Sequence, residues 1–425
     1  MKKLSLVAIA ALCAVSASAM EFQTLGYQSV SMGGAAVANS SGSYATYNNP
    51  ALLAKKKYDA EIALSAGAGV HDHNAGASFQ SLNDSKFVDT INKANNDYTS
   101  LTTQDKQNLV NGKNIIIGMD GNSLEITPQA ALATQFGSFG LGVFATSDIV
   151  ATAHIDQTHN QLIFKNGTNY AKIADDGTMS TSTSDTYGYT TNSLEYAINN
   201  GLSYVQAKGI VVGEVPLAYG HSFELSGGNL MVGGSLKYMQ ALTYIQNMKI
   251  DNSGSQSNST KNDKTDTSFG VDLGLAYIPN FSKDLTLALV GKDLNAPEFS
   301  FVDGSKVKVD PMVRAGFAYN IFESLEIAAD IDLTKNKTLV SGSDSQMAGG
   351  GLNYHPASWF SLRGGLMQNL DSKDNAGIIY TAGLGFGLKW LQIDLSGQYA
   401  SKTTTVNNAT YPEYAKINLA LISRW

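Results

Sequence analysis

The chain has 425 residues, of which 43% are hydrophobic and only 15% are charged, and its formal net charge is -7. Soluble domains usually carry about 25% charged residues, whereas bundles of membrane helices are more hydrophobic than a mean hydropathy of -0.10 allows. The mild acidity also offers no basic surface for nucleic acid. These values fit an all-β transmembrane barrel, because its strands alternate lipid-facing and lumen-facing residues.

Residues 1–19 have the parts of a secretory signal peptide. Two lysines open the segment, the apolar stretch after them is too short to span a bilayer as a helix, and residues 17–19 (Ala-Ser-Ala) form a cleavage site. We expect the mature chain to start at Met20 and to lie in the outer membrane of a Gram-negative-type bacterium. The only cysteine, Cys13, lacks the small preceding residue of a lipidation motif, so we expect no thiol chemistry.

Residues 20–57 form a segment rich in Gly, Ala, Ser and Asn. The segment shows neither strand alternation nor a charged helical face, and it is too apolar for a solvated tail. We therefore expect it to fill the barrel lumen as an N-terminal hatch. Asn49-Pro50 should make the turn into the first strand, because proline fixes its own φ and disfavours a helical conformation for the preceding residue.

The predicted barrel occupies residues 58–425, where apolar and polar residues alternate with the period of two that indicates β-strands. No apolar run long enough for a membrane helix follows residue 19. We predict an even number of strands, as bacterial single-chain barrels have. The predicted antiparallel strands are 58–69, 127–138, 139–153, 209–224, 229–248, 266–280, 284–294, 309–321, 324–335, 345–355, 358–369, 376–390, 391–402 and 411–425.

The final predicted strand ends on an aromatic residue, Trp425. Aromatic residues near strand ends suit the interfacial girdles of a barrel. Outer-membrane barrels end in such a strand, which their assembly machinery reads, so we expect Trp425 to be needed for assembly. The alternative is a soluble β-sandwich or a secreted adhesin, which seldom has strands this long and this many.

Three inserts are too long and too polar for tight turns. Residues 83–113 show helical spacing, residues 155–205 are rich in Thr, Ser, Asn and Tyr, and residues 251–267 are of low complexity and expected to be mobile. Long loops of such barrels face the outside, while the periplasmic turns are short. We therefore place all three inserts on the extracellular side.

Acidic and basic residues are nearly balanced on the predicted inward faces. At mid-membrane a basic side chain facing lipid costs about 2–4 kcal/mol, so these charges should pair inside the lumen with each other and with the hatch. The alternative is an ordinary polar lumen. The balance together with the apolar, Gly-rich N-terminal segment favours a plugged barrel over an open porin. The residues are Asp59, Glu61, Asp272, Glu326, Asp330, Asp332, Asp394, Lys237, Arg314, Arg363, Lys389, Lys416 and Arg424.

Pro216 interrupts a predicted strand, close to Gly213 and Glu214. Proline lacks the N–H that a strand donates to its neighbour, and a closed barrel has no edge strand on which proline is tolerated. We therefore expect the hydrogen-bond ladder to be broken here. The break is either a local bulge without a transport role or a lateral opening in the barrel wall.

Candidate chemical sites are weak. His71-Asp72-His73 is the most metal-like cluster, but two ligands in a loop are fewer than the three or four of a stable site. Residues 120–123 begin like a calcium loop that is not completed. Neither a nucleophile elbow nor a phosphate-binding loop occurs. We expect no enzymatic activity, no metal and no cofactor, and as partners only membrane lipid, the assembly machinery and a hydrophobic small molecule.

Two stretches carry a family resemblance. Residues 31–38 (SMGGAAVA) and 47–54 (YNNPALLA) resemble the N-terminal signature shared by the TraF-like outer-membrane family of plasmid conjugal transfer and the FadL-type long-chain fatty acid transporters. The order of residues 233–238 (GGSLKY), 243–244 (TY), 269–277 (FGVDLGLAY) and 289–295 (LVGKDLN) is similar to the TraF-like family in particular. The chain departs from thioredoxin-like TraF proteins because it has no Cys-x-x-Cys.

The FadL-type resemblance implies a hatch that plugs a 14-stranded barrel, passive uptake of hydrophobic molecules and their sideways release at a strand kink. The hatch motif would comprise Gly33, Gly34, Asn49, Pro50 and Ala51. The function that we expect is passive transport of hydrophobic or amphipathic small molecules such as fatty acids. The alternative is a structural or envelope protein associated with conjugative plasmid transfer.

Overall fold

The computed structural model describes residues 21–40, 42–56, 58–250, 262–340, 342–371, 376–388, 390–407 and 409–425. The expected signal peptide and residues 251–261 of the low-complexity insert lie outside the described residues. Among the helices described, none is both long and apolar enough to cross a bilayer.

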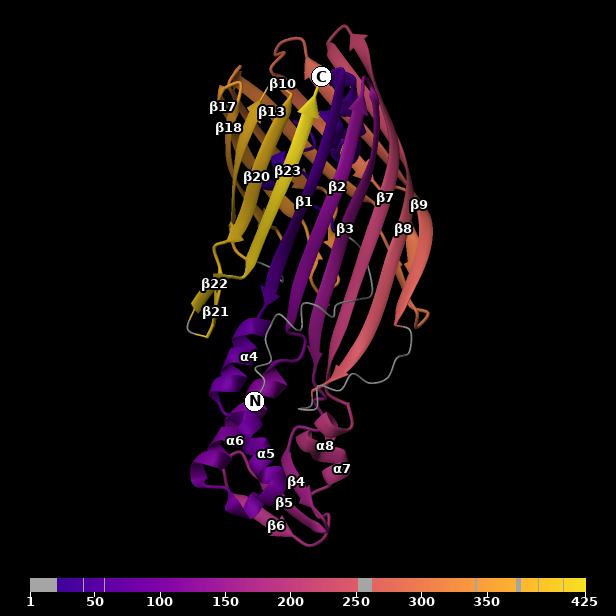
Figure 1. Ribbon diagram of the computed structural model, residues 1–425. Coiled ribbons are helices and arrows are strands. Elements are labelled where there is room, and N and C mark those ends of the chain that lie inside the picture. The colour runs from indigo at the N-terminus through magenta and orange to yellow at the C-terminus, as the bar shows by residue number, and fades with distance from the viewer. Residues whose placement is uncertain are drawn as a thin grey trace.

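Fourteen antiparallel strands close into one barrel (Figure 1). They are β1 (Ala60–His73), β2 (Ser123–Phe136), β3 (Phe139–His154), β7 (Tyr204–Leu225), β8 (Gly228–Lys249), β9 (Asp263–Pro279), β10 (Leu285–Lys292), β13 (Met312–Phe322), β14 (Leu325–Asp332), β17 (Met347–Ala357), β18 (Phe360–Asn369), β19 (Ile379–Leu388), β20 (Leu391–Ala400) and β23 (Tyr414–Arg424). The first and last strands pair along their length, so no edge remains. The predicted fold class is confirmed, and each predicted strand has its counterpart. The predicted C-terminal boundary of the insert 251–267 was wrong, because β9 already begins at Asp263.

Side chains alternate across the barrel wall. On β7, Val215, Leu217 and Tyr219 point outwards with exposed fractions of 40%, 62% and 44%, while the residues between them are buried. Exposed aromatic side chains gather at the end with the short turns, as in an interfacial girdle. They are Phe136, Phe139, Phe281, Phe322, Trp359, Trp390 and Trp425. The outer surface therefore suits contact with lipid.

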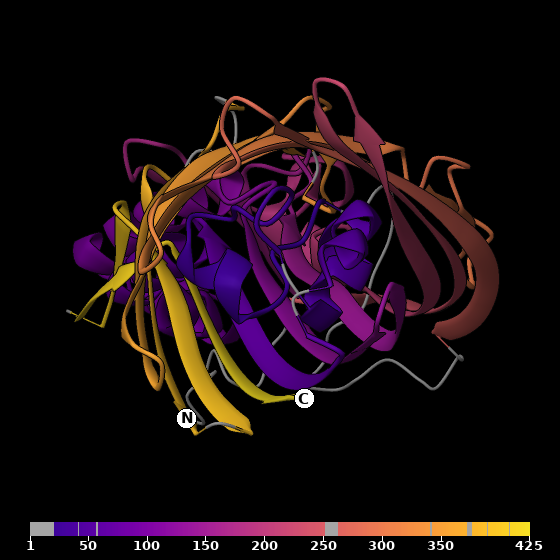
Figure 2. The ribbon, with the colours of Figure 1, turned by 90° about the horizontal axis from the view of Figure 1, so that it is seen from above.

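Residues 21–56, called the luminal segment below, run inside the barrel, where Figure 2 shows the indigo chain within the ring of strands. The segment contains α2 (Tyr27–Ser31), η1 (Gly42–Tyr44), α3 (Ala45–Asn48) and η2 (Pro50–Lys55), and almost all of its residues are buried. The expectation that Asn49-Pro50 turns directly into the first strand was wrong. Asn49 is extended and caps η2, whose first residue is Pro50, and β1 starts only at Ala60. Proline suits that place because the first turn of a helix needs no N–H from it.

The two ends of the barrel differ in their connections. Turns such as 137–138, 226–227 and 323–324 are short, whereas the long loops of the described residues lie at the opposite end. Long loops of outer-membrane barrels face the outside, so that end is called the extracellular end below and the other the periplasmic end. The β1–β2 loop holds α4 (Ala75–Asp84), α5 (Phe87–Asp97), η3 (Tyr98–Ser100) and α6 (Thr103–Gly118), and the β3–β7 loop holds β4 (Leu162–Asn166), β5 (Asn169–Ile173), β6 (Met179–Ser182), α7 (Tyr189–Asn192) and α8 (Leu194–Asn199). Three hairpins occupy other loops: β11 (Glu298–Ser300) with β12 (Lys306–Lys308), β15 (Asn336–Lys337) with β16 (Asp344–Ser345), and β21 (Thr403–Val406) with β22 (Ala409–Pro412).

The two longest loops pack into a small extracellular domain beyond the barrel (Figure 1). Its apolar core joins Phe87 and Leu109 of the helices to Leu162, Phe164 and Leu194 of the second loop. The helical spacing predicted within 83–113 is confirmed. The sheet and helices of residues 155–205 were not predicted, because their few apolar residues give no clear period.

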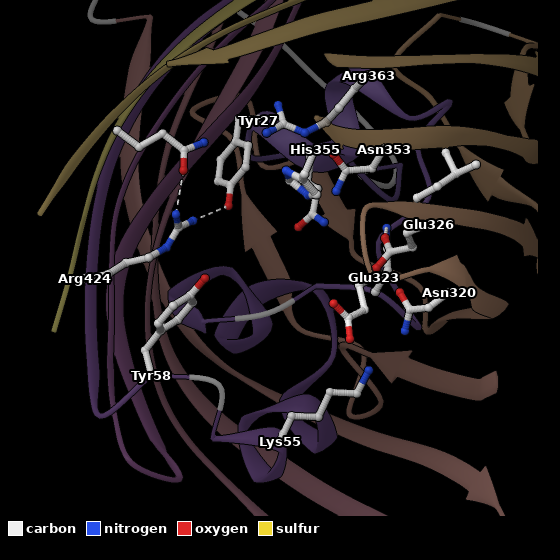
Figure 3. Close-up of a pocket in the computed structure, with 14 residues that line it drawn as sticks. Tyr27, Lys55, Tyr58, Asn320, Glu323, Glu326, Asn353, His355, Arg363 and Arg424 are labelled. Carbon is white, nitrogen blue, oxygen red and sulfur yellow. Dashed lines mark hydrogen bonds between the residues drawn. The ribbon is translucent and has the colours of Figure 1, made fainter. Parts of the chain in front are cut away.

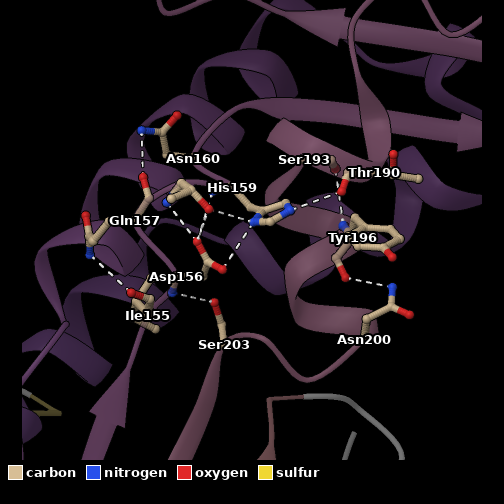
Figure 4. A network of polar contacts seen from close by, with 11 residues as sticks. Ile155, Asp156, Gln157, His159, Asn160, Thr190, Ser193, Tyr196, Asn200 and Ser203 are labelled. Atoms are coloured by element: carbon tan, nitrogen blue, oxygen red, sulfur yellow. Dashed lines mark hydrogen bonds and ion pairs between the residues drawn. The ribbon is translucent and has the colours of Figure 1, made fainter.

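A polar network ties the two ends of the β3–β7 loop together (Figure 4). Oδ2 of Asp156 lies 3.1 Å from Nδ1 of His159, and Nε2 of His159 lies 3.2 Å from the carbonyl oxygen of Thr190. The His159 ring stacks on Tyr196, with the ring centroids 5.8 Å apart. The backbone N–H of Asp156 donates to Oγ of Ser203 at 3.0 Å. The start of the loop is thus fixed to α7, α8 and the entrance to β7.

Glu195 of α8 is a buried acid in this domain. The residue is 7% exposed, and its Oε2 has no hydrogen-bond partner among the described residues. Burial raises the pKa of Glu195 from 4.5 to about 7, although hydrogen bonds from the Lys165 backbone and the Tyr189 side chain oppose the rise. Since the folded pKa lies above the unfolded one, the folded domain binds more protons, and stability falls as pH rises from about 4.5 to about 7.

Glu195→Gln should therefore stabilise the extracellular domain at pH 8 and have little effect at pH 4. Removing the charge should recover about 3 kcal/mol, since the pKa rises from 4.5 to about 7 and one pKa unit corresponds to about 1.4 kcal/mol. Hydrogen exchange of the α8 amides at both pH values measures the difference. Glu224→Gln, at an exposed acid on β7, is the control. Equal protection of wild type and Glu195→Gln at pH 8 would contradict the assignment.

Candidate functional site

The Asn-Pro-Ala motif of the luminal segment lies directly on glycines of the barrel wall. A Cβ atom on Gly233 of β8 would collide with the backbone of Pro50 and Ala51, and one on Gly274 of β9 would collide with the side chain of Asn49. Asn49 Nδ2 also donates to the carbonyl oxygen of Leu275 at 3.3 Å. The wall lacks side chains here because the luminal segment occupies their place.

The glycine pair of the luminal segment likewise packs directly against the backbone of β17 and β18. Gly33 and Gly34 have φ values of +64° and +83°, which favour glycine. A Cβ on Gly33 would also collide with the carbonyl oxygen of Gly350. The Gly33 N–H donates to Oγ1 of Thr381 at 2.9 Å, and that hydroxyl donates to the Ser31 carbonyl at 3.0 Å. The turn at the two glycines is thus held against the wall.

Charged side chains of the wall also bind the luminal backbone. Oδ2 of Asp330 accepts the N–H groups of Ala36 and Val37 at 2.7 and 2.9 Å. Nζ of Lys416 donates to the carbonyl oxygen of Thr24 at 3.0 Å. These bonds satisfy backbone groups that would otherwise be buried without partners.

The remaining luminal charges pair largely with one another. The pairs are Arg314–Asp332 at 2.6 Å, Arg363–Asp394 at 2.7 Å, Arg424–Glu61 at 2.7 Å and Lys237–Asp272 at 3.1 Å. Lys237 also lies 3.3 Å from Glu214, so Glu214 points into the lumen and belongs to an ion cluster. The predicted pairing is confirmed for these residues. Asp59 is an exception, because it precedes β1 and is exposed, and Lys389 lies outside the described residues.

The extracellular half of the lumen contains an apolar cluster, called the luminal apolar cluster below. The barrel wall contributes Val150, Ile210, Val212, Met239, Ala241, Val290 and Met312. The luminal segment contributes Phe22 and Val37, and the extracellular loops contribute Phe299, Phe301, Val307, Val309, Leu339 and Val340. Inward-facing apolar residues on five strands are not what a water-filled pore requires, since such pores have a polar interior.

The periplasmic half of the lumen contains a polar cavity of about 310 Å³ between the luminal segment and the wall (Figure 3). Arg424 donates to the Tyr27 hydroxyl at 2.9 Å and to Oε1 of Gln392 at 2.5 Å at its edge. Glu323 and Lys55 line its other side. The apolar cluster, which has the charged Arg314 beside Phe22, and this polar cavity thus lie in different halves of the lumen.

Strand β3 has a gap in its ladder on each side. Towards β7, Leu141 pairs with Leu217 and Phe144 with Glu214, but no pairs join residues 142–143 to 215–216. Towards β2, the pairs stop at Ile126 and resume at Gln129. The register is the same before and after each gap, so neither gap is a bulge with an inserted residue.

A proline lies at each gap. Pro216 is buried and keeps its pairing with Lys237 of β8, so its missing N–H interrupts only the side towards β3. Gly213 and Glu214, predicted beside an opening, adjoin this gap. Pro128 marks the second gap, which the Ser147 hydroxyl crosses by donating to the Pro128 carbonyl. Pro128 was missed, although a proline within an alternating segment is the same signal.

The prediction from the sequence that the histidine pair lies in a loop was wrong. β1 continues to His73, so His71 and His73 lie on the strand and face the lumen. Oδ1 of Asp120 accepts the N–H of Ile155 at 2.9 Å. Trp425 is 62% exposed, and its backbone bonds to Ala60 where the barrel closes.

A closed 14-strand wall, an apolar exterior and an occupied lumen define a plugged membrane β-barrel. The sequence profile of the family described as "F plasmid transfer operon, TraF, protein" matches residues 46–332, about two thirds of the chain. The chain therefore belongs to this family. A search of curated proteins gives no match.

Solved barrels of similar fold include two channels. The "TodX monoaromatic hydrocarbon channel deltaS2 mutant" has a TM-score of 0.54 and 13% identity, with 96% of this chain and 100% of that chain covered. The "Ralstonia pickettii toluene transporter TbuX" has a TM-score of 0.50 and 14% identity, with 95% and 99% covered. At these identities the likeness concerns the fold.

The seat of the luminal segment can be tested with two adjacent glycines of β8. Gly233→Ala should destabilise the seated segment by about 1–3 kcal/mol, because the added methyl collides with Pro50 and Ala51. Gly234→Ala is the matched control, since its Cβ would meet only Leu273 and Asp272 at 3.5 and 3.8 Å. Single-channel conductance in planar bilayers should rise for Gly233→Ala alone. Equal conductance of both variants would show that this contact does not hold the plug.

Proposed function

We propose that this protein is an outer-membrane channel for the passive transport of hydrophobic or amphipathic small molecules. The luminal apolar cluster carries the proposal. A hydrophobic solute gains about 25 cal/mol for each Å² of apolar surface that it removes from water, so an apolar zone reached from the extracellular loops can take up such a solute. A strongly hydrated solute would gain nothing there.

The similar solved structures support this proposal at the level of solute class. Their titles name a monoaromatic hydrocarbon channel and a toluene transporter. We infer for this chain a solute between a small aromatic hydrocarbon and the alkyl chain of a fatty acid. The cluster is filled by Phe22 and by Phe299 and Phe301 of the loop between β10 and β13, so these side chains must move aside when a solute enters.

This function can be tested by making the luminal apolar cluster more polar in one variant and more apolar in a control. Thr146 on β3 and Val212 on β7 are cross-strand partners, and both are buried. Replacing Val212 by threonine keeps its shape, and replacing Ile210 by threonine also shortens one branch by a methyl group. The two changes add two hydroxyl groups, each of which costs about 1 kcal/mol or more when buried without a partner. Uptake of radiolabelled toluene and of a labelled long-chain fatty acid into proteoliposomes should fall several-fold.

Thr146→Val is the control, because it makes the same place more apolar and should leave uptake unchanged or higher. Empty liposomes give the background, and glucose serves as the polar solute. The proposal fails if wild-type liposomes take up neither hydrophobic probe faster than empty ones do. Comparison of the two probes also distinguishes an aromatic from a fatty acid substrate.

We further propose that the solute leaves sideways through the wall at β3. A hydrophobic solute passing through the periplasmic half would have to enter the polar cavity lined by Arg424, Glu323 and Lys55, which costs free energy. The gap in the strand pairing at Pro216 lies between lipid-facing side chains, since Val143 and Val215 are 49% and 40% exposed. The gap at Pro128 is the competing exit.

Pro216→Ala should restore a donor towards β3, close the gap and lower toluene uptake while the heat-modifiable folded band on gels stays intact. Pro128→Ala is the matched variant on the other side of the same strand. A loss of uptake in Pro128→Ala alone would move the exit to the β2–β3 side. Unchanged uptake in both variants would argue against a lateral exit at β3.

A structural role in conjugative plasmid transfer is the second candidate. The family match favours it, because the description of the family refers to the transfer operon of a plasmid. Mating frequency of a deletion strain distinguishes the two candidates. A loss of plasmid transfer that the Ile210→Thr, Val212→Thr double variant fully restores would favour the structural role.

A further inference from the structure

Strand pairing brings three potential metal ligands together on the luminal face of β1 and β2. His71 and His73 are two positions apart on β1, so their side chains leave the same face of the sheet. Glu125 of β2 is the direct cross-strand partner of His71. Because cross-strand neighbours have Cβ atoms about 5 Å apart, the carboxylate reaches both imidazole rings.

The distances within this group are those of ligands around one ion. Oε2 of Glu125 lies 3.6 Å from Nδ1 of His71 and 3.4 Å from Nε2 of His73. The contact between His73 and Glu125 is also a long hydrogen bond. Two atoms that each bind Zn²⁺ at about 2.1 Å in a tetrahedron are about 3.4 Å apart. All three ligand atoms lie within 4.8 Å of one another.

The surroundings are buried and acidic. The side chains of His71, His73 and Glu125 are 14%, 12% and 11% exposed. Asp148 of β3 is buried, interacts with Glu125, and has an Oδ1 atom without a hydrogen-bond partner among the described residues. A divalent cation here would be held by two imidazoles and Glu125 and would have the second carboxylate of Asp148 close by.

We propose that His71, His73 and Glu125 form a binding site for a divalent transition-metal ion of the Zn²⁺ class. Two imidazoles and one carboxylate are a ligand set that Zn²⁺ accepts while a further position stays open. A cavity of about 60 Å³, lined by His71, Glu125, Glu21 and Tyr414, adjoins the group and offers room for a water molecule or an oxygen donor. The site goes beyond the proposed transport, and neither depends on the other.

The full mature barrel, purified with a histidine-free affinity tag and stripped with a chelator, is the sample for the test. Titration with Zn²⁺ alone in a calorimeter should show saturable binding of one ion per chain. His71→Gln, His73→Gln and Glu125→Gln should each weaken binding by at least about tenfold, as the loss of a ligand does. His221→Gln and His154→Gln, which alter histidines outside the group, should bind like wild type.

A measurement on the wild-type chain keeps the proposal testable if a variant fails to fold. Pulsed EPR of the barrel loaded with Cu²⁺ should detect two imidazole nitrogens at the metal. The proposal is overturned if wild type shows no saturable Zn²⁺ binding, if Glu125→Gln binds as tightly as wild type, or if fewer than two imidazoles are detected. Toluene uptake is measured on the same samples. A barrel that binds no Zn²⁺ but takes up toluene contradicts only the metal site, and a barrel that binds Zn²⁺ but takes up no toluene contradicts only the proposed transport.

Discussion

A barrel of fourteen strands is too wide for its own side chains to fill, and this constraint governs the rest of the molecule. Barrels of about eight strands can be filled by inward-facing residues, whereas larger ones enclose a cavity or a channel. Here the N-terminal segment takes up that space. Its backbone polar groups are removed from water and must find partners on the wall, as the bonds from Asp330 and to Lys416 illustrate.

The wall accommodates the luminal segment in two ways. Where the luminal backbone comes closest, the wall has glycines, as at Gly233 beneath Pro50 and at Gly350 beneath Gly33. Elsewhere it has charged residues held in pairs such as Arg314–Asp332. Breaking one partner of a buried pair costs about 3–5 kcal/mol, whereas the intact pair adds little. The pairs therefore set the position of the plug more than they set its stability.

The same lumen changes character along its length. Loops fold back over its extracellular half and join inward-facing residues such as Ile210 and Met239 in an apolar cluster. The periplasmic half keeps its polar cavity. In the proposed transport, a hydrophobic solute would enter at the apolar cluster and would meet the polar cavity beyond it. This asymmetry, together with the two ladder gaps that flank β3, connects the architecture to the proposed sideways route.

The sequence by itself determined the barrel, its strand order and the inward or outward direction of most side chains, because a period of two maps directly onto the two faces of a wall. It also indicated the ladder break at Pro216, since a missing N–H is a local property. Only the tertiary structure decided which distant residues meet. Glu125 lies more than fifty positions from His71, so no spacing rule could supply the third ligand of the cluster. The apolar cluster likewise draws on residues from Phe22 to Val340, whose contact depends on how loops fold into a lumen rather than on any local period.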